Sequence, residues 1–120
     1  MDGLNYFLPG QVWQYSTRPG EESSTITVLK IDEIEDDAII HIRIDHIQQL
    51  TGGCIQHMPF AADAVLASVT DFVKHLNEVP GFVDGYNQWK QAHDEGKAGY
   101  WNMPVKEAVE AVCQVMSKNE

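Results

Sequence analysis

Hydrophobic and polar residues alternate in the first third of the chain, in three runs separated by turn-forming residues. The runs cover residues 12–15, 24–33 and 38–48. Alternation with a period of two is typical of half-buried β-strands, and tight turns between such runs predict an antiparallel meander. In the third run, isoleucines alternate with polar residues: Ile40, Ile42 and Ile44 against His41, Arg43 and Asp45. We therefore expect one face of this strand to pack on the core and the other to be solvent-exposed or functional.

The predicted turns lie at Arg18-Pro19-Gly20-Glu21 and at Asp36-Asp37. Proline presets the first central dihedral of a turn, and glycine accepts a positive φ. Residues 54–58 then predict a fourth strand, which Pro59 ends.

The second half of the chain changes to helical spacing. An apolar stripe predicts a first helix after Pro59: Ala62, Val65, Leu66, Val69, Val73 and Leu76. Phe82, Tyr86 and Trp89 predict a second helix, which Gly96 ends. Residues 98–102 predict a short fifth strand, and a last helix follows with Pro104 in its first turn.

Strands followed by helices predict an α+β fold, with an antiparallel meander of about four strands and two to three helices on one face. At 120 residues the chain predicts one domain, residues 1–116, with a frayed tail at 117–120.

The formal net charge is −10, and the eight Lys and Arg residues are scattered singly. This charge repels nucleic acid and anionic lipid, so we expect neither as a partner. It favours either solubility or a basic protein partner. The first five residues lack the pattern of a signal peptide. The two cysteines, Cys54 and Cys113, form no spacing typical of a disulfide framework or a zinc site. We therefore expect a cytoplasmic protein.

The chain contains no P-loop, GxGxxG, GxSxG or HExxH motif. The candidate ligand-binding residues are instead polar groups that the predicted strands bring near each other. They are His41, Arg43, Asp45 and His57, with Trp13 or Tyr15 as an aromatic wall. His41, His57 and Asp45 could ligate a divalent metal, but their spacing is equally that of an ordinary surface, so we expect no metal or cofactor.

His57 also precedes Met58-Pro59-Phe60, near a predicted helix start, and in that position it could act as an acid or base. The alternative is a structural one, a proline turn with Met58 and Phe60 in the core. Arg18, at a predicted hairpin tip, could clamp a carboxylate or phosphate, or pair with Glu21 or Glu22.

Tyr100 and Trp101 are candidate interface residues, because neighbours in a strand face opposite ways and one of them would be exposed. Homodimerisation through a sheet edge is also compatible with the pattern.

Residues 10–21, with the later His57-Met58-Pro59-Phe60, resemble a set of small bacterial proteins with no established activity. The resemblance implies a bacterial, single-domain protein and transfers no functional residue. The sequence favours a non-enzymatic module that binds a macromolecule, for example an immunity protein. The alternative is a small-molecule-binding domain or minor enzyme that uses the polar strand face.

Overall fold

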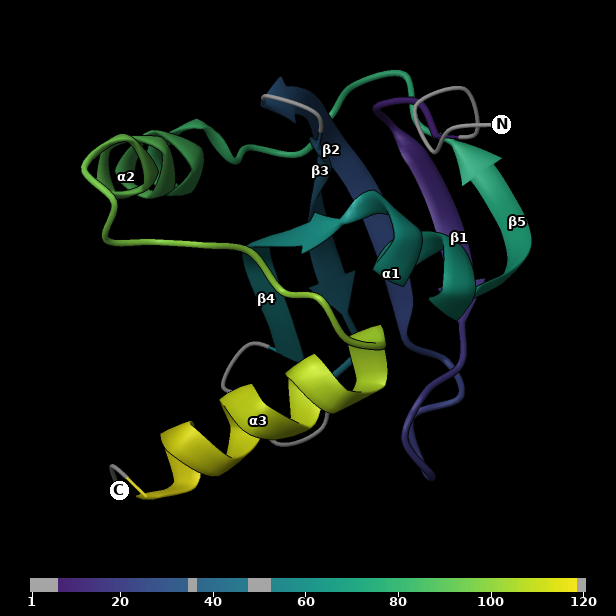
Figure 1. Cartoon of the computed structure of the whole chain (residues 1–120). Coiled ribbons are helices and arrows are strands. Elements are labelled where there is room, and N and C mark those ends of the chain that lie inside the picture. Colours follow the sequence, from purple (N-terminus) through teal and green to yellow (C-terminus); the bar gives the residue numbers. More distant parts are fainter. Residues whose placement is uncertain (1–6, 35–36, 48–52, 119–120) are drawn as a thin grey trace.

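The computed structural model describes residues 7–34, 37–47 and 53–118, and these form one sheet with three helices (Figure 1). In chain order the elements are β1 (Gln11–Tyr15), β2 (Thr25–Ile34), β3 (Asp37–Asp45), β4 (Cys54–Ala61), α1 (Ala62–Ser68), β5 (Val69–His75), α2 (Val83–Asp94) and α3 (Val105–Lys118). The α+β prediction is confirmed. Predicted features at Glu35, Asp36, Gln48, Thr51, Gly52 and residues 1–5 and 119–120 lie outside the described residues.

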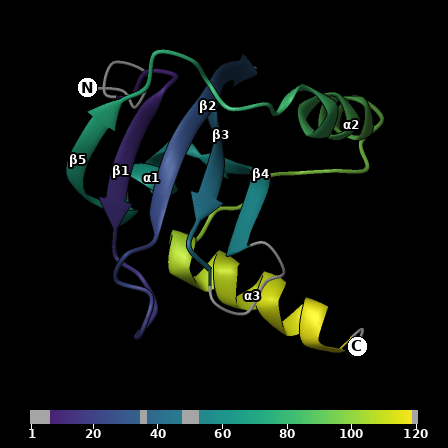
Figure 2. The ribbon, with the colours of Figure 1, turned by 180° about the vertical axis from the view of Figure 1, so that it is seen from behind.

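The five strands are antiparallel in the order β4-β3-β2-β1-β5. Ile34 pairs with Asp37, and this pairing sets the register of the long β2–β3 hairpin. Helix α1 carries the chain from one edge of the sheet to the other, so β4 and β5 form opposite edges (Figure 2).

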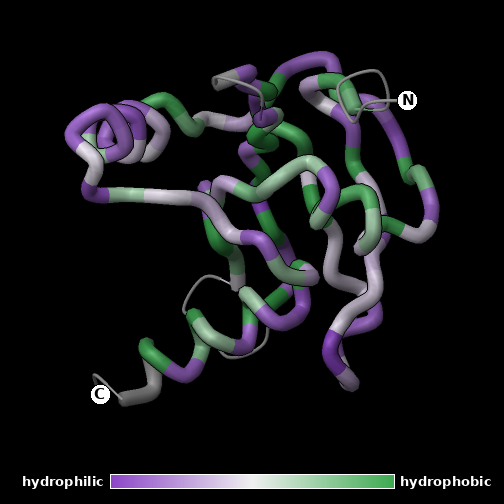
Figure 3. Tube along the Cα trace, viewed as in Figure 1, coloured by the Kyte–Doolittle hydropathy of each residue, from purple (hydrophilic) through white to green (hydrophobic). Residues whose placement is uncertain are grey.

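The main core lies between one face of the sheet and helices α1 and α3. Ile40, Ile42 and Ile44 are fully buried in it, together with Val65 of α1 and Val109 of α3. Figure 3 shows the hydrophobic stretches of the strands converging behind α1 and the start of α3. Four further buried apolar residues lie outside this cluster: Val12, Leu29, Ile39 and Trp89.

The prediction of one helix from residue 62 to 76 is wrong. Helix α1 ends at Ser68, and residues 69–75 form β5, which pairs with β1. The apolar residues of this segment fit a helical stripe, but Val69, Thr70, Phe72 and Val73 are also strong strand formers. Hydrogen bonding to β1 decides between the two, and a propensity pattern cannot contain that information.

Two smaller predictions around β4 are also wrong. Pro59 does not end the strand, because β4 continues to Ala61. The fifth strand is β5, whereas residues 98–102 contribute a single bridge between Trp101 and Phe60. Trp101 accepts a hydrogen bond from the Ala61 N–H (2.8 Å) and donates one to the Pro59 carbonyl (2.9 Å). This contact covers part of the β4 edge.

The β5 edge carries features that discourage pairing with a further strand. Its register with β1 shifts twice, and Lys74 lies within it. Bulges and an edge lysine are common devices against edge-to-edge association. Among the described residues no helix is long and apolar enough to cross a membrane.

Candidate functional site

Three polar side chains from three neighbouring strands meet on the sheet face opposite the main core. Asp32 comes from β2, His41 from β3 and His57 from β4. The Nε2 of His41 lies 3.0 Å from Oδ2 of Asp32, and its Nδ1 lies 2.8 Å from Nε2 of His57. The two imidazole planes differ by 13°, which suits a hydrogen bond within the plane of both rings. These residues form a continuous carboxylate–imidazole–imidazole relay.

Helix α2 covers this relay with two aromatic side chains. Tyr86 donates a hydrogen bond to Oδ2 of Asp32 (2.8 Å), and its ring meets His41 edge-on at 4.9 Å. Trp89 meets His41 in the same way at 4.9 Å and is the buried residue of α2. As a result His41 is 0% exposed. Of the two alternatives for this strand face, solvent-exposed or functional, the first is wrong for His41, because a helix distant in sequence packs over that part of the strand.

Burial shapes the protonation of all three relay residues. Desolvation, reinforced by the nearby His57, lowers the pKa of His41 to about 4. Desolvation also lowers the pKa of His57. Burial alone would raise the pKa of Asp32, but hydrogen bonds from Tyr86, His41 and Lys30 outweigh it and hold this pKa below its usual value. At neutral pH the relay thus holds one carboxylate and two neutral imidazoles.

These charges fix the position of each proton. The Asp32 carboxylate can only accept, so His41 carries its proton on Nε2 and donates it to Asp32. The neutral His41 then has a bare Nδ1, which accepts the Nε2–H of His57. The neutral His57 is left with a bare Nδ1. Among the described residues this atom has no hydrogen-bond partner, and His57 as a whole is half-buried. The relay therefore ends in an acceptor that no described side chain occupies.

A groove of about 360 Å³ begins beside this end of the relay. Its lining residues are Gln56, Gly81, Phe82, Val83, Asp84 and Gly85. A Cβ placed on Gly85 would lie 3.4 Å from the Cβ of His57 and 3.8 Å from its Nδ1. A methyl group at this position would thus lie in van der Waals contact with His57, and glycine leaves that volume unfilled.

The other predicted polar residues of β3 do not join the relay. Arg43 donates a hydrogen bond from Nε to Asp45 (2.9 Å), and its Nη2 lies 3.4 Å from Sγ of Cys54. The carboxylate that meets the histidines is Asp32, not Asp45. His41 uses both ring nitrogens in hydrogen bonds, so it has no lone pair for a metal. Among the described residues no cluster of three His, Cys, Asp or Glu is arranged to hold a metal ion.

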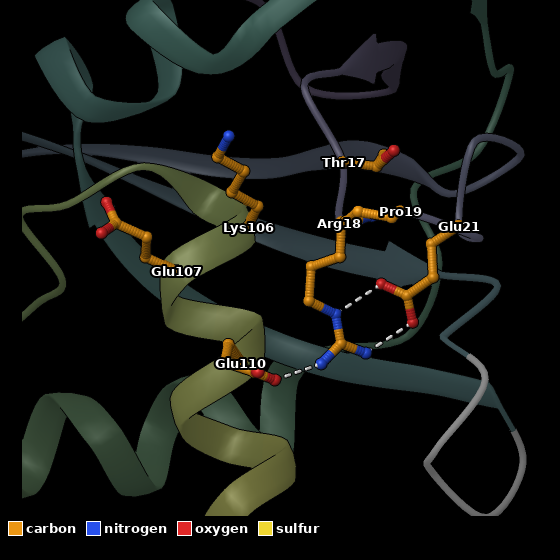
Figure 4. Close-up of a pocket in the computed structure, with 7 residues that line it drawn as sticks. All are labelled: Thr17, Arg18, Pro19, Glu21, Lys106, Glu107 and Glu110. Atoms are coloured by element: carbon orange, nitrogen blue, oxygen red, sulfur yellow. Dashed lines mark hydrogen bonds and ion pairs between the residues drawn. The ribbon is translucent and has the colours of Figure 1, made fainter.

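Arg18 lies far from the relay, where the hairpin tip meets α3 (Figure 4). Its guanidinium bonds both carboxylate oxygens of Glu21, at 2.7 and 2.6 Å, and reaches Glu110 with Nη1 at 2.5 Å. Of the two partners weighed from sequence, Glu21 is the one observed. Glu21 is buried, so this bidentate pair compensates a carboxylate removed from water. The groove beside it, about 470 Å³, carries charges of both signs.

The aromatic residues singled out from sequence contact other parts of this chain. Tyr100 is half-buried and donates to Asp37 (2.9 Å), and Trp101 is half-buried against the main core. Trp13 and Tyr15 belong to the main core, on the face away from His41. They do not form a wall for the relay, because their side chains point to the opposite side of the sheet.

Sequence reasoning paired His41 with His57 but missed Asp32, Tyr86 and Trp89 as their partners. One signal could have found Asp32. If the β2–β3 hairpin pairs Ile34 with Asp37, Asp32 falls opposite Ile39, on the same face as His41 and diagonal to it. No feature of the sequence near α2 indicates that this helix packs over the relay.

No protein-family model, curated protein or solved structure matches the chain.

Proposed function

We propose that the protein binds a small molecule at the open end of the Asp32–His41–His57 relay, where His57 Nδ1 accepts a hydrogen bond or a proton from the ligand. The observation that carries the proposal is this unpartnered nitrogen, held in place by buried His41 and, behind it, by Asp32. Side chains fixed by further hydrogen bonds are typical of binding and acid–base sites.

The relay would make His57 a stronger base than burial alone allows. When His57 takes a proton on Nδ1, its Nε2–H still donates to His41, and His41 still donates to the Asp32 carboxylate. The negative charge of Asp32 thus stabilises the new positive charge through the intervening ring. The ligand class consists of small molecules with a hydroxyl, amine or amide N–H that can face His57.

Two variants test the proposal while leaving Asp32 and His41 unchanged. His57→Gln removes the accepting nitrogen. Gly85→Ala adds a methyl group 3.8 Å from Nδ1, at a helical position where alanine is about 1 kcal/mol more favourable than glycine. Gly99→Ala is the matched control, because a Cβ there meets nothing within 4 Å.

The measurement is ligand-observed NMR with a library of small hydroxyl-, amine- and amide-bearing compounds. We expect at least one compound to bind wild type and the Gly99→Ala control, and to lose roughly tenfold or more in affinity in both site variants. A library without binders, or binders equally tight in the site variants, would contradict the proposal.

A basic protein partner is the second proposal, and the balance of charges supports it. Four of the eight basic residues lie within 4 Å of a carboxylate of this chain: Arg18, Lys30, Arg43 and Lys90. The acidic residues outnumber the basic ones, 18 to 8, which gives the net charge of −10. Such a field steers a basic partner toward the surface.

A pull-down from lysate of the source organism, eluted with a salt gradient, tests this second proposal. We expect a stoichiometric basic protein that moderate salt releases, since salt screens charge attraction. Elution that does not depend on salt, or a bait that elutes alone, would contradict it.

A further inference from the structure

We infer that α2 is a lid over the Asp32–His41–His57 relay, and that protonation of His41 releases it from the sheet. The inference concerns regulation of the site proposed above and rests on that proposal for its biological role. The structural claim itself requires no ligand.

Helix α2 has little apolar surface against the sheet. Of its twelve residues, all described, only Trp89 is buried. Its contacts with the strands are largely those with the relay: Tyr86 on Asp32 and His41, Trp89 on His41, and Gly85 beside His57. An element held by a few polar and aromatic contacts belongs to the less stable part of a fold.

The chain is anchored on both sides of this segment. Before it, the Leu76 N–H donates to the Gly10 carbonyl (2.8 Å). After it, Trp101 is hydrogen-bonded to β4 through its backbone. Residues 77–99 can therefore move while both of their ends stay attached to the sheet. Figure 1 shows α2 set apart from the body of the protein between these two points.

Protonation of His41 disfavours the closed state, because it breaks a hydrogen bond under the lid and leaves a charge in a buried site. A proton on His41 Nδ1 eliminates the acceptor for the His57 N–H, and places two N–H groups 2.8 Å apart in a site closed to water. When α2 leaves, His41 is hydrated and its charged form is no longer penalised. The open state thus binds more protons than the closed one, and opening is favoured as pH falls.

Other charged groups around the relay act in both directions. On β2, the Asp32 carboxylate favours a protonated His41, whereas Lys30, 3.3 Å from Asp32, opposes it. On α2, His93 lies against Trp89, with ring centroids 4.8 Å apart, and Asp94 adds a negative charge near Tyr86. On β4 the facing group is His57. Burial of His41 outweighs the attraction of Asp32, so the closed lid requires this imidazole to be neutral.

Hydrogen exchange followed by mass spectrometry, on the full chain without ligand, tests the lid. Between pH 6.5 and 4, after correction for the intrinsic pH dependence of exchange, we expect protection of residues 77–99 to fall by up to tenfold per pH unit for each proton taken up. Peptides of β2 and β3 should keep their protection. Uniform loss across all peptides, or constant protection of α2, would overturn the inference.

Tyr86→Phe provides the second variant, because it removes the hydrogen bond to Asp32 while keeping the ring. We expect its lid to open at higher pH than that of wild type. His46→Gln, which changes an exposed histidine outside the relay, should open at the same pH as wild type. An opening pH that is unchanged in Tyr86→Phe, or shifted equally in His46→Gln, would overturn the inference. Because no ligand is present, this result stands apart from the binding test above.

Discussion

At the scale of single residues, partners determine whether a polar group can be buried. His41 is fully enclosed, yet both of its ring nitrogens are hydrogen-bonded. Asp32 is the hub, since its Oδ2 accepts from both His41 and Tyr86 while Lys30 approaches Oδ1. A buried donor left without its acceptor costs far more than an exposed one.

Asp32→Asn should therefore lower the free energy of unfolding by about 1–3 kcal/mol, because an amide brings no charge to these donors and places an NH2 group where Oδ1 faces Lys30. Asp45→Asn, which weakens a partly exposed pair with Arg43, should cost less than about 1 kcal/mol. Urea denaturation of both variants measures the difference. Equal losses would show that Asp32 does not organise the cluster.

Residue alternation predicted part of the site and could not predict the rest. Alternation is a local property, so each strand can be identified from its own residues. Consecutive strands of a meander are neighbours, which placed His41 and His57 on adjacent strands. Asp32 needed the register of the β2–β3 hairpin, and Tyr86 and Trp89 needed the path of a helix more than forty residues from His41 along the chain. Contacts of the last kind arise from tertiary packing, which leaves no periodic trace in the sequence.

At the scale of elements, residues 62–76 show how pairing overrides spacing. The segment divides into α1 and β5 because β5 completes the sheet beside β1. The backbone just before β1 approaches the end of β5 too closely for a side chain at residue 10. Gly10 has φ = +95°, and a Cβ there would lie 2.9 Å from the His75 ring and 3.0 Å from the Leu76 carbonyl oxygen.

Gly10→Ala should thus destabilise the protein by about 1–3 kcal/mol, the usual cost of a strained backbone position. Gly99→Ala, which meets nothing within 4 Å, should change stability little. Thermal unfolding followed by circular dichroism compares the two. If both variants unfold at the same temperature, β5 does not pack against Gly10 as described.

At the scale of the whole molecule, acid should destabilise the fold through His41, which is fully buried. The pKa of His41 is about 4 in the folded protein and 6.5 in an unfolded chain. The unfolded chain therefore binds more protons between these values, so stability is complete above pH 6.5 and falls as pH decreases toward 4. The slope should reach about 1.4 kcal/mol per pH unit for one proton.

Chemical denaturation at a series of pH values measures this slope. His57→Gln should retain part of it, since His41 remains buried. A stability that is constant from pH 7 to pH 4.5 would mean that neither relay histidine is held neutral by the fold.

The most direct test of the account is nitrogen-15 NMR of the histidine side chains at neutral pH. The relay predicts that His41 and His57 are both neutral, that each carries its proton on Nε2, and that His41 does not titrate until the pH approaches 4. A proton on Nδ1 of His57, or a charged His41 at pH 6, would contradict the relay and the binding site built on it.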